Sequence, residues 1–183
     1  MDNLLQQTLN LIDQGTVEQR CAAMIVLAAL KLDNASVTQS VGAALDHANP
    51  VLKDYALRYF EEVQSANGTT LVLKFLEDPD KGVQERVVRC LTRVGQGVVQ
   101  PLAQRLPDAS RLWQLNAARI LCATRGKAAL KALLQILRAG TDEFNRAVCD
   151  LMIPMIRHQS QKVQGGRRFS DATQRIFRVE ARE

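Results

Sequence analysis

Apolar residues recur along this chain at helical spacing, in blocks that repeat about every 30 residues. Each block opens on an apolar residue, and small or apolar residues mostly follow four, five and eight positions later. The five opening residues are Val17, Val51, Val83, Leu112 and Phe144, which lie 34, 32, 29 and 32 residues apart. A period of this length is typical of stacked repeats rather than of one globular core.

Each block predicts the second helix of an antiparallel pair, and the residues before it predict the first. Turn residues separate the two helices, as in Asn49-Pro50. No stretch alternates between apolar and polar residues for long enough to predict a strand. The expected pairs are about 4–12 with 17–32, 37–48 with 51–64, 69–77 with 83–94, 98–106 with 110–125, and 127–139 with 142–157.

The pattern changes near residue 157. Pro154 interrupts the last second helix, where it predicts a kink or an early end, because proline removes a helical hydrogen bond. Beyond it, a polar segment containing two glycines predicts a linker, and a short apolar stripe predicts one more helix. The expected organisation is a repeat array at 1–157, a linker at 158–169 and a C-terminal helix at 170–183.

Composition narrows the classes of function. The N-terminus lacks the basic segment of a secretory signal, and the longest apolar run is too short to cross a bilayer, so we expect a soluble, cytoplasmic protein. None of the four cysteines lies in a Cys-X-X-Cys pair, and we expect small buried side chains in a reducing compartment. Only two histidines occur, His47 and His158, and motifs for nucleotide, metal or nucleophile sites are absent. We therefore expect neither catalysis, nor a cofactor, nor a metal.

The turns and the residues that follow them resemble HEAT repeats of the short bacterial type, related to those of phycobilin lyases. The resemblance is clearest in Asn49-Pro50-Val51, in Asp78-Pro79-Asp80 with Val83, and in Leu112 with the Asn-Ala-Ala that follows, and it covers about residues 2–157. It implies an all-α, right-handed α-solenoid of about five helix pairs, followed by the C-terminal helix. In such a solenoid the second helices line a concave face that binds proteins or peptides and sometimes nucleic acid. The arginine that the family places after the valine is missing here, so we expect the buried polar network typical of the family to be missing and the helix pairing to be unchanged.

Three arginines predict one contact surface. Arg86, Arg89 and Arg93 share a face of the third second helix, because their spacing is three and four residues. Guanidinium groups bind carboxylates and phosphates in two-pronged contacts, although a solvated helix face explains the same pattern. Residues three, six, seven and ten positions after each opening residue should also lie on the free side of the second helices. On this register the partner-binding residues would also include Met24, Leu27, Leu115, Arg119 and Leu151.

Three elements could pack against the apolar free side of the second helices: a helix of a partner protein, a second copy of this chain, or the chain's own C-terminal helix. Alternatively, no element packs there, because small alanine and cysteine side chains expose little apolar area. We expect a non-catalytic scaffold that binds a peptide or helix carrying acidic and apolar groups.

The alternative is a nucleic-acid-binding protein, because residues 1–100 carry a net charge of −3 and residues 101–183 carry +8. Trp113 could stack on a base or pack between repeats. No membrane contact is expected.

Overall fold

The computed structural model describes the backbone of residues 2–163 and the side chains of residues 3–153. This part of the chain is helical and contains no strand, which confirms the all-α prediction. The α-helices are α1 (Asp2–Gln14), α2 (Val17–Ala29), α3 (Ala35–Leu45), α4 (Pro50–Val63), α5 (Thr69–Leu73), α6 (Lys81–Val94), α7 (Val99–Arg105), α8 (Arg111–Thr124), α9 (Lys127–Ala139) and α10 (Asp142–Val163). Short 3-10 helices are η1 (Lys74–Glu77), η2 (Gly95–Val98) and η3 (Leu106–Asp108).

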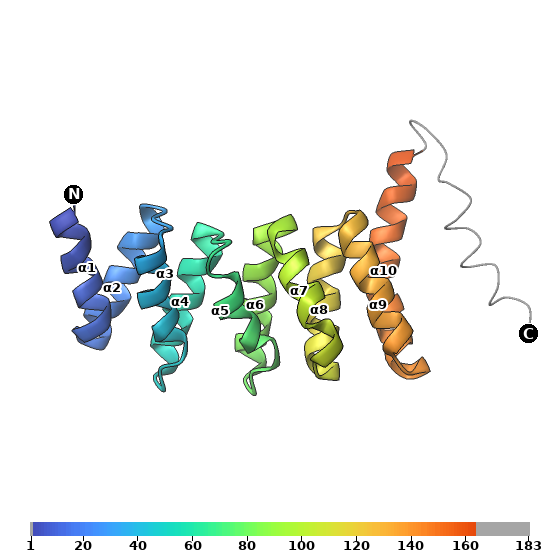
Figure 1. Cartoon of the computed structure of the whole chain (residues 1–183), viewed down its shortest axis with the longest axis horizontal. Coiled ribbons are helices and arrows are strands. Elements are labelled where there is room, and N and C mark those ends of the chain that lie inside the picture. The colour runs from blue at the N-terminus through green and yellow to red at the C-terminus, as the bar shows by residue number, and fades with distance from the viewer. Residues whose placement is uncertain (1, 164–183) are drawn as a thin grey trace, which may run out of the picture.

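The helices follow one another in chain order along the long axis, so that α1 and α10 lie at opposite ends (Figure 1). The odd-numbered helices contact one another in sequence and form one layer, and the even-numbered helices form the other. Contacts within the even-numbered layer are the more extensive. Buried apolar side chains run through the molecule between the two layers as one connected core.

Polar caps decide where the even-numbered helices begin. Thr16, Asn49, Asp80 and Ser110 accept hydrogen bonds from backbone amides in the first turns of α2, α4, α6 and α8. Such side chains satisfy amides that the helix leaves without partners. The first apolar residue follows its cap at a distance that varies from helix to helix. Equivalent positions are therefore defined by the caps.

The cap positions correct one prediction. Met24 and Leu27 lie in the core instead of on the free side of α2, where Ile25 is exposed. Each residue turns an α-helix by about 100°, so a register error of one residue moves a side chain to another face. The sequence prediction counted positions from the first apolar residue, Val17, which lies one position after its cap in α2 but two positions after it in α4. Counting from the cap Thr16 gives the observed faces of α2.

The last helix differs from the expectation at Pro154. α10 continues to Val163, so it includes this proline and the first residues of the expected linker at 158–169. A proline costs one hydrogen bond and a clash with the preceding turn, which a long helix can absorb without ending. The predicted early end was therefore wrong, and the expected helix at 170–183 lies outside the described residues.

Candidate interaction surface on the even-numbered helices

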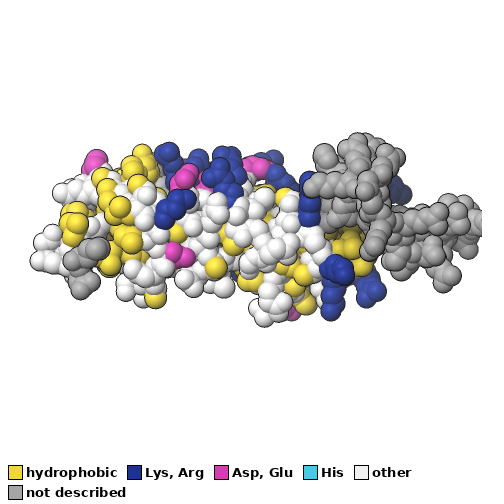
Figure 2. All heavy atoms as spheres, turned by 90° about the horizontal axis from the view of Figure 1, so that it is seen from above, with side chains coloured by type: hydrophobic (Ala, Val, Ile, Leu, Met, Phe, Trp, Pro, Cys, Tyr) yellow, Lys and Arg dark blue, Asp and Glu magenta, His cyan; other side chains and the backbone are white. Residues whose placement is uncertain are grey.

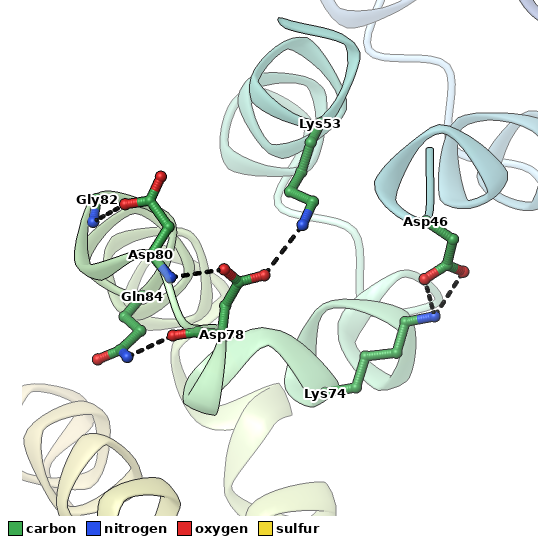
Figure 3. A network of polar contacts seen from close by, with 7 residues as sticks. All are labelled: Asp46, Lys53, Lys74, Asp78, Asp80, Gly82 and Gln84. Atoms are coloured by element: carbon green, nitrogen blue, oxygen red, sulfur yellow. Dashed lines mark hydrogen bonds and ion pairs between the residues drawn. The ribbon is translucent and has the colours of Figure 1, made fainter. Parts of the chain in front are cut away.

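A polar network joins α4 to α6 (Figure 3). The Lys53 side chain reaches from α4 to Asp78, whose Oδ2 lies 3.0 Å from the Lys53 Nζ and whose Oδ1 accepts from the Asp80 amide at 3.0 Å. Gln84 Nε2 donates to the Asp78 carbonyl at 2.6 Å. Because the Asp78 side chain is almost fully buried, these bonds replace the water it loses. The network fixes the turn before α6 against the preceding pair.

A second polar junction joins α8 to the segment before α6. Trp113 is fully buried and its indole N–H donates to the Leu73 carbonyl at 3.0 Å. Asn116 Nδ2 donates to the Leu76 carbonyl at 2.7 Å. Trp113 therefore packs between helix pairs, and its ring does not offer a surface for a base. Residue types other than the missing arginine therefore build a buried polar network at this junction.

The even-numbered helices have one face directed away from the odd-numbered layer. We call this face the outer ridge, and its central row consists of Ile25, Arg58, Arg89 and Arg119. Alignment on the caps places Ile25, Arg58, Arg89 and Arg119 at equivalent positions of α2, α4, α6 and α8. Ile25, Arg58 and Arg89 are exposed, and Arg119 is half-buried. Figure 2 shows the corresponding pattern on the molecular surface, with hydrophobic side chains toward the N-terminal end and Lys and Arg, mixed with acids, along one edge.

Three arginines of α6 and α8 bind a carboxylate of the preceding even-numbered helix. Arg86 Nη2 lies 2.8 Å from Asp54 Oδ1, and Arg93 Nε lies 3.5 Å from Glu61 Oε1. These ion pairs explain part of the basic cluster as contacts between helices. Of the three arginines predicted on α6, only Arg89 has no hydrogen bond or ion pair with the described residues.

Arg119 pairs with Glu85 through both terminal nitrogens, at 2.7 and 2.6 Å. These hydrogen bonds hold the pKa of the Glu85 carboxyl below its usual value and raise the pKa of Arg119. Both groups are therefore charged at neutral pH. Arg58 makes no comparable pair within the described part of the chain, and its guanidinium lies 5.4 Å from the centre of the Tyr55 ring.

The remaining predicted residues are less exposed than a free helix side requires. Leu115 and Leu151 are half-buried against the core, while Leu112 is exposed on α8. Sequence reasoning missed Ile25 and Arg58. The capping residues Thr16 and Asn49 were the signal that would have identified both.

The described residues hold no group of three metal-ligating side chains, and no helix among them is long and apolar enough to span a membrane. No protein-family model matches this chain, and no curated protein sequence does so either. A functional assignment therefore depends on the geometry and charge of the outer ridge.

Proposed function

We propose that this protein is a HEAT-like, right-handed α-solenoid that acts as a non-catalytic scaffold, and that its outer ridge binds a helical segment of a partner protein. Helix pairs that pack in chain order support the solenoid arrangement. The even-numbered helices contact one another more extensively than the odd-numbered ones, as expected if their layer is the inner, concave side of a curved array. The outer ridge then lines the concave face.

The observation that carries the proposal is that Arg58 and Arg89, at equivalent positions of α4 and α6, are exposed and have no ion pair with the described carboxylates. Arg119 continues the row on α8, where Glu85 already binds it. Neighbouring packed helices lie about 8–10 Å apart, so the backbone positions of the three arginines recur at about that interval. A ligand helix lying across the ridge rises about 10.5 Å in seven residues and presents the same face again. Acidic residues at seven-residue intervals would therefore meet successive arginines. Ile25, at the next position of the row, would receive an apolar residue of the same ligand face.

Charge favours a protein ligand over nucleic acid. Asp54, Glu62 and Glu85 lie among the arginines of the even-numbered helices, and their carboxylates would repel a continuous row of phosphates. Basic side chains of the C-terminal half also serve the fold. Arg105 and Arg111 lie 5.6 and 5.0 Å from the centres of the Trp113 and Phe144 rings.

A designed peptide tests this proposal. The probe is a fluorescently labelled helical peptide with glutamates at seven-residue intervals and a leucine at the next interval, and its binding is followed by anisotropy. The control peptide has the same composition with the glutamates moved off this spacing. We expect the probe to bind at least tenfold more tightly than the control peptide.

Two protein variants locate the contact. The double change R58E/R89E should weaken binding of the probe by about tenfold or more, because each exposed pair contributes about 0.2–1 kcal/mol and reversal adds repulsion. The matched control K127E/K131E makes the same charge change on α9, in the other layer, and should leave the affinity unchanged. Equal affinity of the two peptides, or of R58E/R89E and the unchanged protein, would refute the proposal. Retention of duplex DNA at low salt without binding of the peptide would replace it by the nucleic-acid function.

A further inference from the structure

The first helix pair exposes several large apolar side chains. Leu4 and Leu11 on α1 are 69% and 42% exposed, and Val26 and Leu30, at the end of α2, are 49% and 62% exposed. We call these four residues the N-terminal face. Isolated apolar residues are common on protein surfaces, but a group on one helix pair indicates an unfilled contact.

The second helix pair shows what this face is built to do. The alignment that matches Thr16 with Asn49 also matches Leu4, Leu11 and Val26 with Val37, Ala44 and Tyr59. All three of these equivalents are fully buried. Tyr59 points toward the first pair, because its hydroxyl donates to the Leu32 carbonyl at 2.5 Å. Tyr59 therefore reaches the preceding pair, and α3, which carries Val37 and Ala44, contacts α1 of that pair.

The first pair has no preceding pair among the described residues, yet it keeps apolar side chains at the stacking positions. An array that ended in water would carry polar residues there, because terminal repeats need a polar outer face. We propose that the N-terminal face binds the N-terminal face of a second copy of this chain, in a two-fold symmetric, head-to-head dimer.

The charge distribution favours this occupant. The described charged residue of α1, Asp13, is equivalent to Asp46, which pairs with Lys74 of the following helix pair and not with the preceding one. Two copies can therefore meet without burying an ion or opposing like charges. The charged residues of α2 lie elsewhere. Glu18 is equivalent to Val51 on the outer ridge, and Arg20 is equivalent to Lys53, which reaches toward the following pair.

The opposite end of the array is a poorer match for the N-terminal face. On α9 the exposed Leu130 stands between Lys127 and Lys131, which are exposed as well. A head-to-tail contact would press these ammonium groups against apolar residues and would leave the array open to further growth. A head-to-head contact instead joins apolar to apolar surface and closes after two copies. It would also bring the two Ile25 ends of the outer ridge toward each other.

Sedimentation equilibrium of the full chain tests the proposal over roughly 1–100 μM. The unchanged protein should show a monomer–dimer equilibrium. The variants L4E and V26E should raise the dissociation constant by roughly 100-fold or more, because each change occurs twice in a symmetric contact. Both residues are exposed, so the helical circular dichroism should be unchanged.

The matched control is L130E, which introduces the same charge at an exposed leucine of the other end and should dimerise like the unchanged protein. The proposal is wrong if the unchanged protein is a monomer throughout the range. It is equally wrong if L4E and V26E leave the dimer intact, if L130E disrupts it, or if the mass grows past that of a dimer. Loss of the dimer on truncation of residues 164–183, with L4E and V26E unaffected, would assign the contact to that segment.

Discussion

Replacing Asn116 by alanine should destabilise the array at one junction, between α8 and the segment before α6. Asn116 is 3% exposed, and its Nδ2 donates to the Leu76 carbonyl at 2.7 Å and to Gln84 Oε1 at 3.3 Å. Its Oδ1 accepts from Arg119 at 3.2 Å. The variant N116A removes all three contacts and leaves the Leu76 carbonyl without this donor.

The size of the effect follows from these contacts. A buried hydrogen bond contributes about 0.5–1.5 kcal/mol net, and a buried carbonyl that loses its donor costs about 1–3 kcal/mol. The higher helix propensity of alanine raises the free energy of unfolding by up to about 0.7 kcal/mol, which offsets part of this loss. We therefore expect the free energy of unfolding to fall by about 2 kcal/mol. With a slope of about 1–3 kcal/mol per molar urea, the midpoint should fall by about 1 M.

Trp113 is the only tryptophan and lies at the same junction, so its fluorescence reports local unfolding. The assay is a urea titration followed at once by tryptophan fluorescence and by circular dichroism. The matched control N10A makes the same substitution on α1, where Asn10 is exposed and accepts only from Gln6, and it should leave the midpoint unchanged or slightly raised. If N116A and N10A had the same midpoint, the polar junction would not hold the helix pairs together and the reasoning would fail.

Two further predictions concern ionisable groups. Burial raises the pKa of Cys90 to about 12 and that of Cys122 to about 11, so neither thiol should react with Ellman's reagent at pH 8 until urea unfolds the chain. Cys149 is exposed and should react in the native state, so rapid reaction of more than two of the four thiols would contradict the placement of Cys90 and Cys122. The Arg119 hydrogen bonds lower the pKa of Glu85 below 4.5, so this carboxylate contributes stability above pH 4.5 and loses it as the pH falls through the folded pKa. The stability difference between the unchanged protein and E85Q should therefore be constant near neutral pH, stay below about 1 kcal/mol because the pair is exposed, and vanish in acid; a difference that grew in acid urea titrations would reverse this sign.

The local sequence was sufficient to predict the helices, because their signals lie within each helix. The block that opens at Val83 predicted a helix ending at Val94, and α6 ends there. Asn49 with Pro50 predicted the start of α4, where the asparagine caps the helix and the proline needs no amide hydrogen. These signals involve residues one turn apart, so the packing of other helices does not change them.

The predicted contact surface was less accurate, because orientation depends on more than spacing. Arg86, Arg89 and Arg93 share one side of α6, as their spacing required. Their availability depends on α4, which provides Asp54 for Arg86 and Glu61 for Arg93. No pattern within one helix contains that information.

The same limit explains why the N-terminal face could not be recognised from apolar spacing alone. Leu4 and Leu11 fit the helical pattern of a buried face, as Val37 and Ala44 do, and the first pair resembles the second in sequence. Among the described residues only the second pair has a pair before it, and that difference accounts for the different exposure of equivalent positions. In an array whose units contact only their neighbours, burial is a property of the junction and not of the unit. An apolar residue at a stacking position therefore indicates a contact that the unit can make, and the exposed ones on the first pair mark the surface where we propose that a second copy binds.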